Sequence, residues 1–205
     1  MCDEMMEKKQ EFCRTRNVIA ITNRKLCDRS FEEQIRRVCS LHPKAVILRE
    51  KDLKEEAYRE CAKRVKAICE FYKVPCIFHT FWNVAMAEGA DLLHLPFPLL
   101  QEIWQSKNHA VLNSFQKIGT SIHSVTEAQQ AEQIGVSYLT AGHIYATDCK
   151  KGLPPRGIGF LKEVCDAVSL PVYGIGGIKF DENQWDELEH AGAAGGCIMS
   201  GMMKI

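Results

Sequence analysis

Residues 137–152, SYLTAGHIYATDCKKG, contain the transition from which we infer the fold. The run 137–141 is typical of the end of a buried β-strand, and it leads into a polar loop. Within ten residues after Gly142 the loop offers an imidazole, a phenol, a hydroxyl, a carboxylate, a thiol and two ammonium groups. We therefore expect the chemistry of the protein to lie where its strands end in polar loops.

Outward from this stretch, short apolar runs alternate with segments of helical periodicity along the whole chain. Ser30 to Glu33 and Ser124 to Glu127 have the spacing of helix-starting capping boxes. Eight strands alternating with helices predict an α/β protein, the (β/α)8 TIM barrel, with a doubly wound open sheet as the alternative. The predicted strands are 18–23, 45–49, 75–79, 91–95, 117–121, 137–141, 172–175 and 196–199.

The two ends of the chain depart from a regular barrel. Residues 1–16 are polar and predict an N-terminal extension, and residues 17–205 predict a single TIM-barrel domain. The sequence ends at Ile205, soon after the eighth predicted strand, so the eighth helix is expected to be short or missing. The extension or a partner subunit could cover the surface left open, which makes a homodimer one possible assembly.

Composition excludes several classes of function. The chain of 205 residues has 25% charged and 46% hydrophobic residues and a formal net charge of zero, so no global field favours nucleic acid or acidic membranes. No apolar run reaches the length of a membrane span, and no secretion signal is evident, which predicts a cytoplasmic protein. The ten cysteines contain no Cys-x-x-Cys pair and are expected to be core residues. Cys149 is the exception, because Lys150 and Lys151 favour its thiolate.

Glycine-containing loops after the last two strands suggest an anion site. In a TIM barrel, phosphate commonly binds after strands seven and eight. Gly176-Gly177 and Ser200-Gly201 occupy those places, and their backbone N–H groups and hydroxyl suit a phosphate dianion. Lys150 could neutralise the anion. Thr147 could hydrogen-bond a ligand or only cap its loop.

Histidines supply candidates for an acid and a base. His123 follows the fifth strand directly, between two serines, and an imidazole gives and takes protons near neutrality. A lone histidine is more often structural, and His94, inside an apolar strand, is read that way. His79 and His143 end neighbouring strands, so a zinc site is conceivable. No short pair of ligands supports one, and we predict neither a metal nor a cofactor.

Several of these motifs resemble the thiamine-phosphate synthase family from about Val18 to Gly201. The matching segments are LREKDL (48–53), GAD (89–91) before a strand ending in His-Leu (94–95), SIHS (121–124) and GIGGI (174–178). Within the family, GHIYATDCKKG (142–152) is most similar to the TenI branch, the thiazole tautomerases. The resemblance implies a (β/α)8 barrel and a small phosphorylated thiazole as ligand.

Departures from the family pattern distinguish between its branches. Synthases hold a pyrimidine diphosphate through Mg²⁺, with an Asn-Asp pair after strand three and an acidic residue after strand four. This chain has His79 and Thr80 at the first place and no carboxylate at the second, and Ile47 replaces the family's glutamine. Because Mg²⁺ usually binds through carboxylates, we expect the synthase reaction to be crippled.

The resemblance also implies roles for single residues. His123 would be the acid and base that aromatises a thiazole carboxylate phosphate. The substrate would be bound by the residues named above and by the side chains of Arg49 and Lys51. These two cations could instead form ion pairs with Glu50 or Asp148. The implied substrate-binding residues are Arg49, Lys51, Ser121, Thr147, Lys150, Gly176, Gly177, Ser200 and Gly201.

Three hypotheses follow. The first is a thiazole tautomerase, an isomerase of thiamine biosynthesis. The alternatives are a thiamine-phosphate synthase with an altered diphosphate site, which is a transferase, and a non-catalytic binder of thiazole phosphate or thiamine phosphate. The apolar pair Phe81-Trp82 lies where a synthase binds its metal, and it favours the tautomerase and the non-catalytic binder over the synthase.

Overall fold

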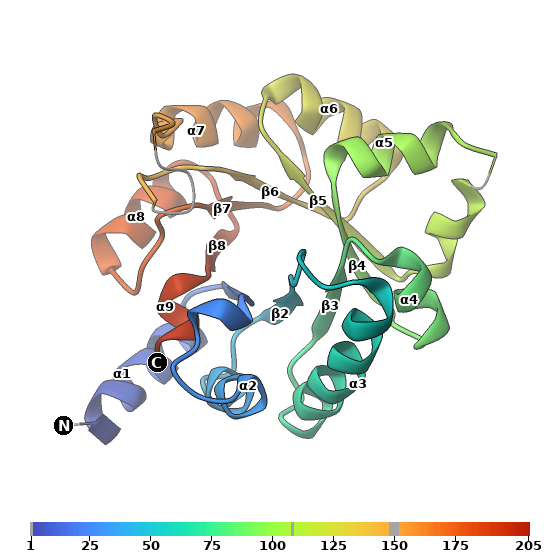
Figure 1. Ribbon diagram of the computed structural model, residues 1–205. Coiled ribbons are helices and arrows are strands. Elements are labelled where there is room, and N and C mark those ends of the chain that lie inside the picture. The colour runs from blue at the N-terminus through green and yellow to red at the C-terminus, as the bar shows by residue number, and fades with distance from the viewer. Residues whose placement is uncertain (1, 108, 148–151) are drawn as a thin grey trace. The chain divides into compact units, whose positions relative to one another are not determined.

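The computed structural model describes residues 2–107, 109–147 and 152–205. Its eight strands are all parallel where their pairing is defined, and they form a closed barrel in chain order, which confirms the predicted TIM barrel (Figure 1). The strands are β1 (Val18–Ile21), β2 (Ala45–Leu48), β3 (Cys76–His79), β4 (Leu92–Pro96), β5 (Lys117–Ile122), β6 (Tyr138–Gly142), β7 (Val172–Ile175) and β8 (Gly195–Ile198).

Helices separate the strands as the periodicity predicts. Ser30 and Ser124 each accept a hydrogen bond from the backbone N–H three residues later, so both predicted caps are confirmed. The helices are α1 (Cys2–Thr15), α2 (Phe31–Ser40), α3 (Glu55–Phe71), α4 (Trp82–Ala87), α5 (Phe97–Gln105), α6 (Val125–Ile134), α7 (Gly157–Ala167), α8 (Glu182–His190) and α9 (Ser200–Met203), with 3-10 turns η1 (Arg24–Leu26) and η2 (His109–Ser114).

The chain divides into two compact units. The first runs to Leu92 and includes Ile198–Ile205, and the second is Leu93–Cys197. The division into an N-terminal extension of residues 1–16 and a single domain of residues 17–205 stays a prediction.

In the first unit, the C-terminal residues are bound to α2 and to the segment before it. Gln34 Nε2 donates to the carbonyl of Met202 at 2.6 Å, and Arg29 donates to the carbonyl of Ile205. Helix α9 has four residues, so the expectation that the eighth helix is short is confirmed. Gln10 of α1 donates to the carbonyl of Ser40 at the end of α2. The homodimer stays a prediction.

In the second unit, β5, β6 and β7 have two different faces. Toward the helices, a Cβ added to Gly174 would meet side chains of α7 and α8. The opposite face of β5 and β6 carries Ser121, Tyr138 and Thr140, because side chains alternate along a strand and Gly119 and Ser121 pair with Tyr138 and Thr140. This second face positions the polar groups described below.

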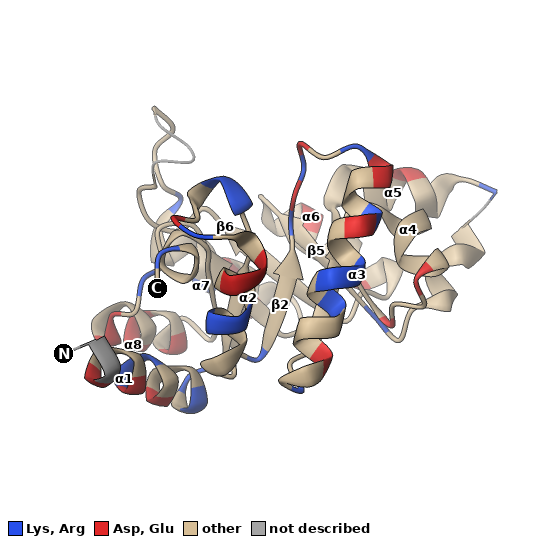
Figure 2. Ribbon diagram, turned by 60° about the horizontal axis from the view of Figure 1, so that its bottom comes forward, with Lys and Arg blue, Asp and Glu red and all other residues tan. Residues whose placement is uncertain are grey.

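Charges are mixed on the outer helices. Figure 2 shows acidic and basic residues side by side on α1, α2 and α3, as the zero net charge suggests. Among the described residues, no helix is both long and apolar enough to cross a membrane.

Candidate functional site

His123 is the first residue after β5, and its ring is fixed by the neighbouring strand. Its Nδ1 lies 3.0 Å from the carbonyl oxygen of Gly142, the last residue of β6. A carbonyl can only accept, so Nδ1 carries a proton and donates it. In the neutral ring Nε2 is then the unprotonated nitrogen, which can act as a base. The residue is exposed.

The start of α6 holds the backbone of His123. Glu127 Oε2 accepts the backbone N–H of His123 at 2.5 Å, while the Ser124 hydroxyl accepts the N–H of Glu127 at 3.1 Å. The two bonds satisfy the N–H of the residue before the N-cap and an N–H in the first turn of α6. The end of β6 therefore holds the imidazole of His123, and the start of α6 holds its backbone.

The loops that follow β6 and β7 are hydrogen-bonded to each other. The backbone N–H of Ile144 donates to the carbonyl of Ile175, and that of Tyr145 donates to Gly176, both at 2.9 Å. The loop after β6 is also bonded to the start of α7, since Arg156 N–H donates to the carbonyl of His143. The ladder between the two strands thus continues into their loops.

Gly176 and Gly177 are required by this close packing. Their φ angles are +99° and +71°, which side chains rarely adopt. A Cβ on Gly176 would lie 2.3 Å from the Cβ of His143, and one on Gly177 would lie 2.6 Å from the carbonyl oxygen of Ala146. Sequence reasoning explained this pair by the close approach of a ligand. The structure adds the approach of the neighbouring loop.

Tyr145 joins this loop to α8. Its hydroxyl donates to Glu187 Oε2 at 2.6 Å, and burial, helped by this hydrogen bond, raises its pKa. Thr147 is half-buried at the end of the described part of the loop. The predicted roles of Cys149, Lys150 and the neighbouring residues 148 and 151 lie outside the described residues.

His143 is a buried imidazole, 6% exposed. Its Nε2 lies 3.4 Å from the carbonyl of Leu153, and its Nδ1 has no hydrogen-bond partner among the described residues. His94, read from the sequence as structural, is also buried and bonded to Ser121 and Tyr138.

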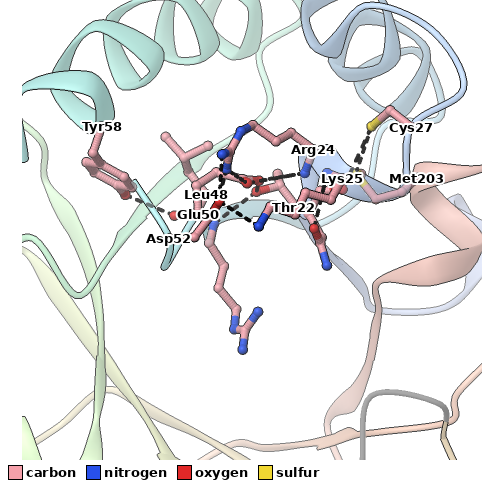
Figure 3. Close-up of polar contacts among 11 residues, drawn as sticks. Thr22, Arg24, Lys25, Cys27, Leu48, Glu50, Asp52, Tyr58 and Met203 are labelled. Carbon is pink, nitrogen blue, oxygen red and sulfur yellow. Dashed lines mark hydrogen bonds and ion pairs between the residues drawn. The ribbon is translucent and has the colours of Figure 1, made fainter. Parts of the chain in front are cut away.

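The first unit contains a second polar cluster, centred on Glu50 (Figure 3). This carboxylate is 2% exposed and accepts hydrogen bonds from the Thr22 hydroxyl at 2.7 Å and from the backbone N–H of Arg24 at 3.1 and 3.2 Å. The Arg24 guanidinium adds an ion pair at 3.0 Å. Two loops, those after β1 and β2, are thereby joined.

Arg24 also forms a bidentate pair with Asp52, with two contacts of 2.7 Å. Hydrogen bonds from Arg24 and then Lys25 hold the pKa of Asp52 well below its usual range. Sequence reasoning missed Arg24, although opposite charges at the ends of neighbouring strands, Arg24 and Lys25 against Glu50 and Asp52, were a usable signal.

The remaining predicted residues of this unit have different surroundings. Arg49 is half-buried, and its backbone N–H donates a hydrogen bond to the Thr22 hydroxyl at 2.9 Å. Lys51 is exposed. Ser200 is exposed at the start of α9, followed by Gly201. Because Gly176 and Gly177 belong to the other unit, the idea that all four bind one phosphate stays a prediction.

The end of β3 differs from a magnesium site in its donors. His79 is buried and its Nδ1 lies 2.7 Å from the Thr80 hydroxyl, while Thr80 has φ +70°. Phe81 stacks on Tyr58 with ring centroids 4.3 Å apart. Imidazole and hydroxyl groups suit Mg²⁺ less well than carboxylates. Within the described residues, no group of three or more His, Cys, Asp or Glu is placed to hold a metal ion.

The fold and the loops define a TIM-barrel protein with polar groups at the carboxyl ends of its strands. Residues 18–202 match the sequence model of the family described as thiamine monophosphate synthase, and the chain belongs to this family.

Relatives agree with this assignment. The chain is 32% identical over 163 residues to a protein named putative thiamine-phosphate synthase 2 from Aquifex aeolicus, covering 80% of this chain and 86% of the relative. It is 34% identical over 178 residues to the thiamine-phosphate synthase of Clostridium acetobutylicum, covering 85% and 79%. The structure of the thiamine phosphate pyrophosphorylase from Pyrococcus furiosus has the same fold, with TM-score 0.75, 24% identity and coverage of 96% and 89%.

Proposed function

We propose that this chain is an enzyme that binds a phosphorylated thiazole and moves a proton on its ring, with His123 as the acid and base. The observation that carries the proposal is the 3.0 Å contact between His123 Nδ1 and the carbonyl of Gly142. It leaves Nε2 to remove a proton at one ring position and return it at another. The family membership supports the substrate class.

A second candidate is the transferase reaction for which the relatives are named, the synthesis of thiamine phosphate. The names of the relatives favour this reaction over the isomerase. Against it stand His79 and Thr80, which occupy the place of the carboxylate-containing pair that binds Mg²⁺ in the synthase pattern. Both reactions use a phosphorylated thiazole, so the two proposals share the ligand.

Two assays on purified protein separate them. The first follows single-turnover aromatisation of the thiazole carboxylate phosphate tautomer without added metal. The second follows thiamine phosphate formation from thiazole phosphate and pyrimidine diphosphate with Mg²⁺. We expect turnover in the first assay, its loss in His123→Ala, and unchanged turnover in His190→Ala, which removes an exposed imidazole on α8. Turnover only in the second assay, abolished by chelation, would establish the transferase instead.

A further inference from the structure

Four polar side chains of the second unit are joined by hydrogen bonds on one face of β4, β5 and β6. The ring of His94 lies between Tyr138 and Ser121, with Nδ1 3.0 Å from the phenol oxygen and Nε2 2.8 Å from the serine oxygen. The Thr140 hydroxyl lies 3.0 Å from the same serine oxygen. Ser121 is thus contacted from two sides.

Tyr138 determines which nitrogen of His94 carries the proton. Its hydroxyl is buried, and burial raises its pKa well above the usual value, so the phenol keeps its proton. Within the described residues, its hydrogen-bond partner is His94 Nδ1. A buried donor left without an acceptor costs free energy, so the phenol donates to Nδ1. The imidazole proton then lies on Nε2, which donates to Ser121.

Thr140 sets the direction of the other bond. The residue is 1% exposed, and its hydroxyl contacts the oxygen of Ser121. If Ser121 donated to Thr140, the threonine proton would be buried without an acceptor among the described residues. Thr140 therefore donates, in the same direction as His94.

Packing holds Tyr138 in this position. Its ring meets that of Tyr173 edge-on with centroids 5.9 Å apart. On its other side lies Gly119, where an added Cβ would be 2.1 Å from the phenol ring. The ring fills the space left by the missing side chain, so the phenol cannot turn away from His94 without repacking.

The oxygen of Ser121 accepts two hydrogen bonds, so its own proton remains to be donated. Ser121 is half-buried, one residue before the end of β5, and lies two residues before His123, which directly follows the strand. We propose that His94 is a positioning residue, which with Thr140 orients the Ser121 hydroxyl as a hydrogen-bond donor to an anionic oxygen of the substrate. The phosphate and the carboxylate of the thiazole ligand both offer anionic oxygens that can accept this hydrogen bond. The identity of the ligand rests on the proposed function.

The first measurement uses the free protein and needs no ligand. The ¹⁵N chemical shifts of the histidine rings, with His94 assigned by comparison with His94→Gln, report which nitrogen is protonated. We expect the neutral Nε2–H form at pH 7, and mixing of the two tautomers in Tyr138→Phe. An Nδ1–H ring or a doubly protonated ring in the wild type would overturn the inference.

The second measurement is a double-mutant cycle on the affinity for the thiazole carboxylate phosphate. Ser121→Ala and His94→Leu should each weaken binding about tenfold, and the double variant should bind no worse than Ser121→Ala alone. His94→Gln, which keeps an N–H donor, should retain most of the affinity. Additive losses would show that His94 acts through the fold and not through Ser121, and would overturn the inference.

A third arm repeats the cycle with the dephosphorylated thiazole carboxylate. Loss of the Ser121→Ala effect assigns the bond to phosphate, and its persistence assigns the bond to carboxylate. If wild type binds no thiazole while the Nε2–H tautomer is observed, the proposed function fails and the orientation of Ser121 stands.

Discussion

The packing of the β6 and β7 loops gives a prediction that separates backbone strain from steric contact. Gly176 and Gly135 both have positive φ, +99° and +91°. A Cβ on Gly135 would meet nothing within 4 Å, whereas one on Gly176 would lie 2.3 Å from the Cβ of His143 and 2.8 Å from its Cα. Gly135→Ala is therefore a matched control for Gly176→Ala.

The two substitutions should differ in the free energy of unfolding. An alanine held at positive φ costs about 1–2 kcal/mol, which is all that Gly135→Ala should lose. Gly176→Ala adds an overpacking cost of about 1–3 kcal/mol, because the atom it strikes belongs to the backbone or lies next to it. We expect a total loss of about 2–5 kcal/mol by urea denaturation. Equal losses for the two variants would refute the reasoning.

Gly176→Ala should also disturb the site. The added methyl group must push away His143, which directly follows Gly142, the residue whose carbonyl holds the His123 ring. We expect the rate of proton transfer to fall more than the affinity for the ligand. Gly135→Ala, at the end of α6, should leave the rate unchanged at a temperature where both variants are folded.

Three further substitutions test other parts of the structure. Glu50→Ala leaves the buried Thr22 hydroxyl and the part-buried backbone N–H of Arg24 without this acceptor, and should cost about 3 kcal/mol in urea denaturation. A loss below about 1 kcal/mol would contradict the central role of Glu50. Ser124→Ala removes the cap of α6 and should cost about 1 kcal/mol, with faster hydrogen exchange confined to the first turn, and unchanged exchange there would contradict the cap. Burial and Glu187 raise the pKa of Tyr145, so its contribution to stability is complete below about pH 10 and is lost as the pH rises further. Tyr145→Phe should flatten this alkaline loss above about pH 10, and an unchanged slope there would count against it.

The fold could be predicted because its signals are local. Each strand is a short apolar run between helical patterns, and Ser30 and Ser124 mark helix starts in three or four residues of sequence. The contact of Phe81 with Tyr58 of α3 could not be predicted, because the two residues are 23 positions apart in the chain. Such contacts leave no trace in local periodicity.

The candidate site was predicted in part for the same reason. His123 was found because it follows a strand directly. The hydrogen bonds that give His94 and Arg24 their roles join residues on different strands, 27 and 26 positions from their partners Ser121 and Glu50. Spacing in the sequence cannot reveal them, and a buried histidine in an apolar strand reads as structural until its two ring nitrogens are seen to be bonded.

The most direct test of the central claim follows a proton from solvent to substrate. The aromatisation is carried out in D₂O without added metal, and deuterium in the thiazole product is measured by mass spectrometry for wild type and for His123→Ala. If His123 removes and returns the proton, wild type should form the product faster than the uncatalysed reaction, with solvent deuterium in every molecule whose imidazole N–H exchanged before the proton was returned. The variant should bind the ligand without exceeding the uncatalysed rate of product formation and of deuterium incorporation. Equal incorporation by both proteins would contradict the role of His123.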